Sequence, residues 1–185
     1  RDALNEYLGN IIDMMTEHGA DIVKFAGDAV MALWEVKKMG STKSSHANAK
    51  ETALRATAVC LKMNAAMDQY TCRGLPKGST LRLHTAIGYG TLSVMFVGGV
   101  DGHWLQLPVG DPITQVAPIL DAAEPGTLVV SKETHNLLKD AFQCNPVNKM
   151  VEEEDGKDAG GATKEDNDNM DGNGGGSRGE WSVDN

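Results

Sequence analysis

Long apolar runs, paired cysteines and an opening methionine are all missing from this sequence. No stretch approaches the roughly 18 consecutive apolar residues of a membrane-spanning helix, and no signal peptide is visible, so we expect no membrane span. The three cysteines are odd in number and form no Cys-x-x-Cys pair, which argues against a disulfide framework or a zinc site. They favour a reducing compartment, and we expect a cytoplasmic location. Because the chain opens on Arg1, we expect a piece of a longer product.

An excess of basic residues is also missing, and the acidic charge is concentrated near the C-terminus. The net charge is −9, and residues 151–185 hold 11 acidic against 3 basic residues, so they carry −8 and the remaining 150 residues about −1. A nearly neutral domain has no basic footprint for nucleic acid. The acidic segment is rich in Gly, Asp, Glu and Asn and predicts disorder. We therefore expect a folded domain over residues 1–145 and a disordered tail over residues 146–185.

Apolar periodicity predicts strands alternating with helices. Leucine, isoleucine and methionine recur at helical spacing over residues 2–18, and a second helix is expected from about residue 50 to 69 after a polar loop over 37–49. Strands are expected over 21–26, 29–34, 81–89, 92–97, 103–109 and 127–130, with helices over 112–123 and from the N-cap Ser131 to about 142. This alternation indicates an α+β or α/β domain.

The stretch "DIVKFAGDAVMALW", residues 21–34, places a charged pair between two apolar runs. Gly27 and Asp28 form a two-residue gap with glycine first, which predicts a tight hairpin. Such a turn can hold the carboxylate of Asp28 at the edge of a sheet, where a hard cation such as Mg²⁺ takes one or two carboxylates. From spacing alone, simple turn chemistry is the more economical interpretation, and Lys24 would be an exposed strand lysine.

The wider sequence resembles the catalytic domains of the class III nucleotidyl cyclases. The segments that carry the resemblance stand in family order between about residues 4 and 138: "GADIVKFAGDAVMALW", "LRLHTAIGYGTLSVMFVGG" and "HWLQLPVGDPITQVAPILDAAEPGTLVVS". Within the family, "VKFAGDA", "ALW" and "LSVMFVGG" look most similar to the first catalytic domain of the soluble, bicarbonate-responsive adenylyl cyclases. The resemblance implies an α+β sandwich with a ferredoxin-like βαββαβ core, whose first strand would be missing from this fragment.

The resemblance also implies a site. Asp28 matches one of two aspartates that hold a pair of Mg²⁺ (or Mn²⁺) ions, and so would be both a metal ligand and a catalytic residue. Lys24 matches the position that reads the purine, where lysine fits adenine, and Phe25, Ala26 and Gly27 complete the implied nucleotide-binding segment. The implied substrate is ATP.

Several positions depart from the family pattern. The other metal aspartate lies in a strand before the first helix, and Asp2 does not match it. Complete domains carry Asn and Arg where this chain has Thr114 and Pro118, and a polar adenine-reading residue where it has Leu107. The arginine of the bicarbonate pocket matches Ala117, which makes bicarbonate regulation doubtful.

Two functions follow from these matches and departures. In the first, the domain is the metal-supplying half of an adenylyl cyclase that makes 3′,5′-cyclic AMP and pyrophosphate, is inactive alone and needs a second cyclase domain in the same or another chain. In the second, it is a catalytically silent cyclase-like module that regulates or dimerises. Retention of Asp28 in an intact turn favours the first.

Overall fold

A computed structural model describes residues 2–37, 45–71, 76–147 and 180–183 of the chain. The mixture of helices and strands confirms the predicted α+β class. The elements follow in the order α1 (Asp2–Glu17), β1 (Asp21–Ala26), β2 (Ala29–Leu33), α2 (Ser45–Ala66), β3 (Thr85–Ile87), β4 (Leu92–Val100), β5 (His103–Gly110), α3 (Asp111–Ala122), β6 (Leu128–Ser131), α4 (Lys132–Leu138), β7 (Cys144–Pro146) and β8 (Glu180–Val183). Within these ranges, no helix is both long and apolar enough to cross a membrane.

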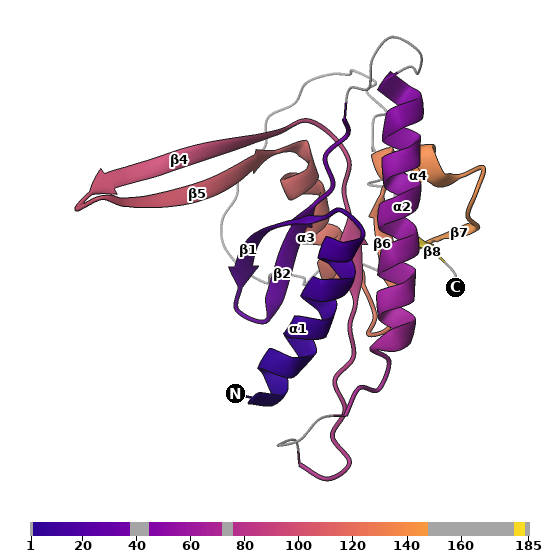
Figure 1. The fold of residues 1–185 in the computed structure, drawn as a ribbon. Coiled ribbons are helices and arrows are strands. Elements are labelled where there is room, and N and C mark those ends of the chain that lie inside the picture. The colour runs from indigo at the N-terminus through magenta and orange to yellow at the C-terminus, as the bar shows by residue number, and fades with distance from the viewer. Residues whose placement is uncertain (1, 38–44, 72–75, 148–179, 184–185) are drawn as a thin grey trace, which may run out of the picture.

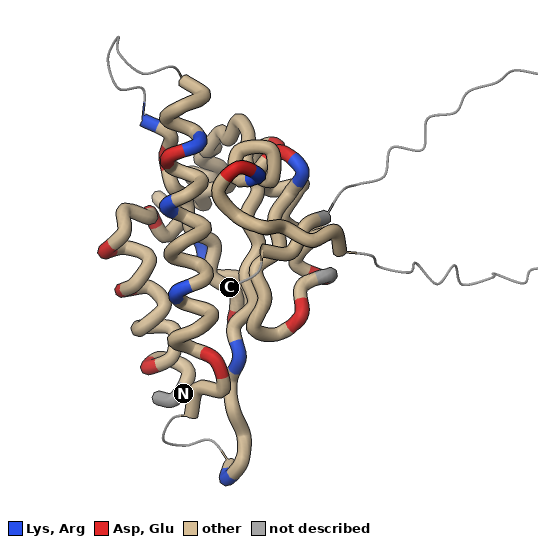
Figure 2. Tube along the Cα trace, turned by 90° about the vertical axis from the view of Figure 1, so that its right-hand side faces the viewer, with Lys and Arg blue, Asp and Glu red and all other residues tan. Residues whose placement is uncertain are grey.

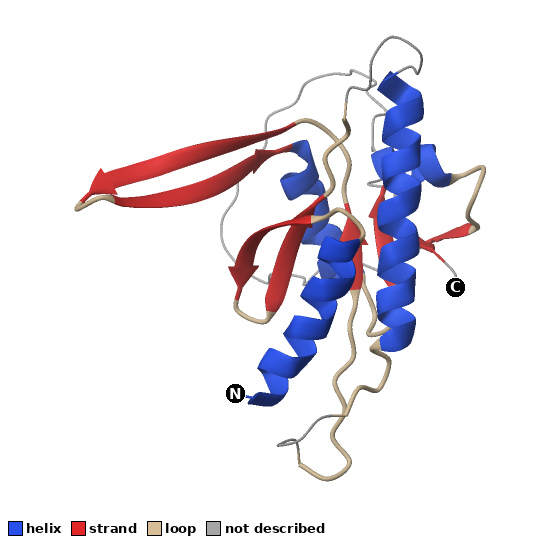
Figure 3. Ribbon diagram, in the orientation of Figure 1, coloured by secondary structure: helices blue, strands red, loops and turns tan. Residues whose placement is uncertain are grey.

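The strands form one sheet and two separate hairpins. The sheet has the order β3-β6-β8-β7, in which β3 and β6 are parallel and the other neighbours are antiparallel. Both α2 and α3 contact β3 and β6, and Figure 1 shows α2 in front of these strands and α3 behind them. The hairpins β1–β2 and β4–β5 are not hydrogen-bonded to the sheet in the described part of the chain. Figure 3 shows the β1–β2 hairpin behind α1 and the longer β4–β5 hairpin extending away from the helices.

Helix α1 is amphipathic and ends where glycine permits a change of direction. Tyr7, Ile11 and Met15 recur every four residues and are all buried, whereas Leu4 is 41% exposed. Burial of each large apolar side chain contributes about 1.5–3 kcal/mol relative to exposure. Gly19 has a φ of +83°, a left-handed conformation that a side chain would disfavour, and the chain then enters β1.

The hydrophobic core lies between these helices and the central strands. Val59 and Met63 from α2 and Met67 directly after it cluster with Leu128 and Val130 of β6, and Leu137 and Leu138 of α4 complete the cluster. The strand β6 is buried along its whole length. The predicted N-cap of α4 is confirmed, since Ser131 Oγ accepts a hydrogen bond from the backbone N–H of Thr134 at 3.2 Å.

Several element boundaries differ from the sequence predictions; helix α4, for example, ends at Leu138 and not near residue 142. Helix α2 begins at Ser45, inside the loop predicted over residues 37–49, and residues 38–44 lie outside the described part. Alanines at 47, 49 and 53 favour this earlier start, and Ala49 and Ala53 are buried. The strand predicted over 81–89 is confined to Thr85–Ile87, because only these residues pair with β6, and Leu81 instead bridges to Tyr70.

The prediction of a disordered segment throughout residues 146–185 is wrong for its last described residues. Glu180–Val183 form β8, which pairs with β6 on one side and β7 on the other. Val183 is 4% exposed, and the Trp181 ring stacks on His135 with a centroid separation of 3.9 Å. These contacts offset the cost of ordering a short segment, which composition averaged over the whole tail does not show. Residues 148–179 lie outside the described part.

Candidate active site

The β1–β2 hairpin forms as its sequence predicts. Phe25 pairs with Val30 and Ala26 with Ala29, which leaves Gly27 and Asp28 as the two turn residues. Gly27 has a φ of +65° and Asp28 does not have a positive φ, the pattern of a type II′ turn. A glycine in the first turn position supplies this conformation without steric cost. The register also shifts between Ile22 and Lys24, so a bulge lies at the base of β1.

Asp28 is exposed, and its carboxylate has no hydrogen-bond or ion-pair partner among the described residues. Lys24 lies on the same hairpin, also exposed and without such a partner. Alternation along β1 puts the side chains of Lys24 and Phe25 on opposite faces of the hairpin, and Phe25 is 52% exposed. Lys24 on β1 and Asp28 in the turn are both exposed near the turn end of the hairpin, here called its rim, and the Phe25 side chain lies on the face opposite Lys24.

The donor set at this rim fits one ligand position for a hard cation. A carboxylate without a protein partner can coordinate Mg²⁺, which usually binds through one or two carboxylates and keeps water or phosphate oxygens in its other positions. No group of three or more His, Cys, Asp or Glu side chains able to hold a metal is found in the described ranges. Asp28 is thus suited to share an ion with other ligands and with a phosphate-bearing substrate.

Helix α3 is held firmly at its start. The Gln115 side chain accepts a hydrogen bond from the backbone N–H of Tyr89 at 3.0 Å and donates to its carbonyl at 3.1 Å. A Cβ added at Gly88 would lie 2.8 Å from the Pro112 carbonyl oxygen, so the glycine lets the helix approach this closely. At Gly110, with a φ of +144°, a Cβ would collide with the Thr91 carbonyl. These contacts fix the first turn of α3 against the loop after β3.

The exposed face of α3 offers no positive charge. Thr114, Ala117 and Pro118 are all exposed at helical spacing, and α3 contains no lysine or arginine in its sequence DPITQVAPILDA. Thr114 donates its hydroxyl hydrogen bond to the Asp111 carbonyl at 2.9 Å. Pro118 has no backbone N–H, so it cannot donate to the Thr114 carbonyl. Leu107, half-buried on β5, pairs with Met95. This face therefore lacks the guanidinium that a transferring phosphate would need.

The β4–β5 hairpin carries a surface that the sequence analysis did not single out. It extends from the body of the domain as a two-stranded arm ending in the turn Asp101–Gly102 (Figure 1). Its large apolar side chains are exposed, from 38% at Val94 to 77% at Val100; they are Val94, Met95, Phe96, Val97, Val100, Trp104 and Leu105. A contiguous exposed apolar surface of this kind marks an interaction site, and a two-stranded hairpin alone is marginally stable.

The sequence contained a signal for this arm. The run LSVMFVGGV has no polar alternation, although a hairpin covered on one face should alternate between apolar and polar residues. Strands apolar on both faces are covered on both faces. No described residue covers these side chains, so the arm presents apolar residues to its surroundings.

Comparison with known proteins supports the fold. No protein-family model matches the sequence, and no curated protein matches it. Among solved structures, the adenylyl cyclase CyaB from P. aeruginosa is similar with a TM-score of 0.66 and 23% identity, over 100% of this chain and 81% of that one. The guanylyl cyclase Cya2 is similar with a TM-score of 0.60 and 21% identity, over 97% and 77% of the two chains.

A third similar structure is the guanylate cyclase domain of RhGC from Catenaria anguillulae in complex with GTP. Its TM-score is 0.62 at 16% identity, over 98% of this chain and 81% of that chain. The chain therefore has the fold of adenylyl and guanylyl cyclase catalytic domains, as the sequence resemblance implied. The similar structures include both adenylyl and guanylyl cyclases, and the similarity extends to the class III cyclase fold without singling out the soluble, bicarbonate-responsive branch.

Proposed function

We propose that this domain is the metal-supplying half of an adenylyl cyclase, which converts ATP to 3′,5′-cyclic AMP and pyrophosphate. The observation that carries the proposal is Asp28, an exposed and unpartnered carboxylate in a two-residue turn on a cyclase fold. Because the proposed substrate is ATP and the buried Cys60 is a free thiol, we also propose a cytoplasmic setting.

The residues of the hairpin have separate roles in this proposal. Asp28 would hold Mg²⁺ or Mn²⁺, which when bound supplies a positive charge that activates the ribose hydroxyl and neutralises the triphosphate. The Lys24 ammonium is only a hydrogen-bond donor, so it complements the acceptor nitrogens on the edge of adenine. Guanine presents donors at the corresponding edge, and there a carboxylate would be favoured. The backbone of Phe25, Ala26 and Gly27 connects Lys24 to Asp28 and would contact the nucleotide between them.

A second cyclase domain completes the site. Complete cyclase domains carry Asn and Arg at the positions that Thr114 and Pro118 occupy on the exposed face of α3. In this proposal, the groups that orient the ribose and stabilise the phosphate therefore come from a partner. The apolar β4–β5 arm is suited to hold that partner. One similar structure is a non-canonical dimeric guanylyl cyclase domain, so pairing does occur between domains of this fold.

The alternative is a catalytically silent module that only pairs with another cyclase domain. The absence of basic residues from α3 favours it, whereas the unpartnered Asp28 favours catalysis. Both alternatives use the β4–β5 arm for association, so only an activity measurement separates them.

The test is a cyclase assay on the full-length protein that contains this domain, with Mg²⁺ or Mn²⁺ and either ATP or GTP. We expect cyclic AMP from ATP, and we expect Asp28→Asn to lower the rate by more than tenfold, or about 1.4 kcal/mol in barrier height. The matched control is Asp13→Asn, which changes an exposed aspartate on α1, away from the hairpin and the arm, and should leave the rate within about twofold.

The nucleotide preference is tested in the same assay with Lys24→Glu, which should shift the ratio of rates towards GTP. If Asp28→Asn and Asp13→Asn had equal rates, Asp28 would have no metal role. If the full-length protein made no cyclic nucleotide yet still associated through this domain, the silent module would be the correct function.

A further inference from the structure

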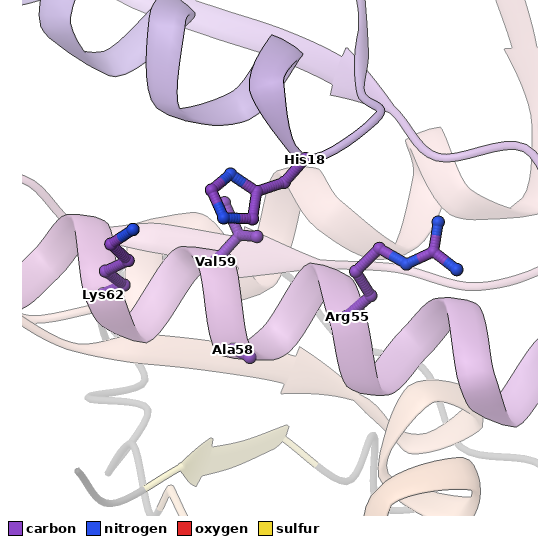
Figure 4. A pocket seen from close by; sticks show the side chains of 5 residues that line it. All are labelled: His18, Arg55, Ala58, Val59 and Lys62. Carbon is purple, nitrogen blue, oxygen red and sulfur yellow. The ribbon is translucent and has the colours of Figure 1, made fainter.

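A small pocket lies between the end of α1 and the outward side of α2, apart from every residue of the candidate active site. Its volume is about 150 Å³, and it is lined by His18, Arg55, Ala58, Val59 and Lys62 (Figure 4). Arg55 and Lys62 are two helical turns apart, with the short side chains Ala58 and Val59 between them. The floor is therefore apolar and both ends are cationic.

His18 closes the pocket from the α1 side. Its Nδ1 lies 2.8 Å from the Met14 carbonyl oxygen, and because a carbonyl can only accept, Nδ1 carries the proton and donates it. In the neutral ring Nε2 is then an acceptor, open to a hydrogen bond donated by a protonated oxygen of a ligand. Figure 4 shows the ring hanging over Val59, between Lys62 and Arg55 in that view. The Trp34 indole donates to the His18 carbonyl at 3.2 Å, so the segment that carries His18 is fixed from behind.

Neither cation of the pocket, Arg55 or Lys62, is neutralised by a strong partner. Arg55 faces Glu51 on its own helix at 3.7 Å, with both side chains about half exposed, and such a surface pair contributes little. Its Nη1 would lie 3.9 Å from a Cβ placed on Gly19, so the guanidinium reaches across to the end of α1. Lys62 has no ion-pair or hydrogen-bond partner among the described residues.

The charges on α1 and α2 leave Arg55 and Lys62 as the cations beside the pocket. The α2 sequence has three basic residues, Lys50, Arg55 and Lys62, against the single acid Glu51. Lys50 is already engaged by Asp140 at 2.8 Å. The α1 sequence is acidic and has no lysine or arginine, and Figure 2 shows acidic positions along one helix and basic positions along its neighbour. Arg55 and Lys62 are therefore the cations of α2 that remain available to a ligand.

We propose that this pocket binds a small oxyanion with two negative charges, of the phosphate type. One oxygen group meets the Arg55 guanidinium, whose planar fork matches phosphate geometry, and another meets the Lys62 ammonium. The single protonated oxygen of a hydrogen phosphate dianion donates to the acceptor His18 Nε2. A bound anion would bridge the end of α1 to α2 and so stabilise the folded domain by mass action. The inference holds whether or not the domain cyclises nucleotides, because no residue of the pocket belongs to the candidate active site.

The experiment is an NMR titration of the 185-residue chain with inorganic phosphate, at constant pH and with sodium chloride adjusted to constant ionic strength. We expect saturable shifts of the Trp34 indole N–H and of the amides of residues 18–20 and 55–62, with the exposed Trp104 indole as an internal reference. Arg55→Gln with Lys62→Gln should weaken binding by at least about tenfold. The matched control, Lys77→Gln with Lys132→Gln, removes the same net charge at exposed sites and should stay within about twofold.

Three results would overturn the proposal: no saturable shift at tens of millimolar phosphate, equal weakening in the two double variants, or equally tight binding of acetate. The last would show that the pocket has no preference for a dianion. If the Arg55 and Lys62 double variant lost its dispersed spectrum, Lys62→Gln alone serves instead, because Lys62 is exposed and has no partner to lose among the residues that the structure describes. That single variant should still weaken phosphate binding, and unchanged affinity would contradict the assignment.

Discussion

Replacing Val183 with alanine should destabilise the domain, although the residue stands near the end of an acidic, glycine-rich segment. Val183 is 4% exposed and pairs with Leu128 of β6, which is fully buried, and with Cys144 of β7. The substitution removes two buried carbon atoms at about 0.8 kcal/mol each, and the cavity left behind adds to this loss. We expect a decrease of about 2 kcal/mol in the free energy of unfolding.

Thermal unfolding measured by circular dichroism is the assay. For a domain of about 150 residues, a loss of 1 kcal/mol lowers Tm by about 2–4 °C, so Val183→Ala should lower it by roughly 4–8 °C. The matched control is Val100→Ala, the same substitution on the arm at a side chain that is 77% exposed. Surface substitutions change stability by less than about 0.5 kcal/mol, so this control should leave Tm nearly unchanged.

Equal Tm values for the two valine variants would refute the reasoning. The result would mean that Val183 is not packed in the core and that β8 is not an integral strand of the sheet. A truncation that removes residues 180–185 gives a second measurement. It deletes the pairing with both β6 and β7, so it should destabilise the domain more than the point substitution does.

Three further outcomes are expected. Replacing residues 148–179 with a short glycine-rich linker should change Tm little, because Pro146 and Trp181 are paired and the two cut ends lie side by side; a large drop in Tm would show that the segment contributes to folding. Burial first and Lys139 second lower the pKa of His135, so on acidification the unfolded state takes up the proton first, below its usual value near 6.5. Stability in urea should then fall between about pH 6.5 and the lowered folded value, and His135→Gln should remove this part of the pH dependence, whereas an unchanged profile would contradict the assignment. Phe96 is 66% exposed on the arm, and the substitution Phe96→Asp should weaken association with the partner domain by about tenfold. Analytical ultracentrifugation measures this association, with Lys77→Asp as a control away from the arm.

Local signals in the sequence determined several elements of the domain by themselves. The spacing of Tyr7, Ile11 and Met15 specifies a helix with one buried face, and Gly19 provides its end. The two-residue interval Gly27–Asp28 specifies the hairpin that presents the candidate metal ligand. These features depend on neighbouring residues and on the conformational preferences of single positions, so they are readable without knowing what packs against them. The order of three motifs along the chain was enough to imply the cyclase fold.

Other features exist only because distant segments meet. Glu180–Val183 form a strand because β6 and β7 offer hydrogen-bonding edges and the core accepts Val183, a gain that the composition of the tail cannot reveal. The strand at residues 85–87 is short because β6 supplies partners for those residues alone. The pocket combines His18 from one helix with Arg55 and Lys62 from another. In each case the deciding free energy comes from contacts between residues far apart in sequence, and the packing of the whole chain sets those contacts.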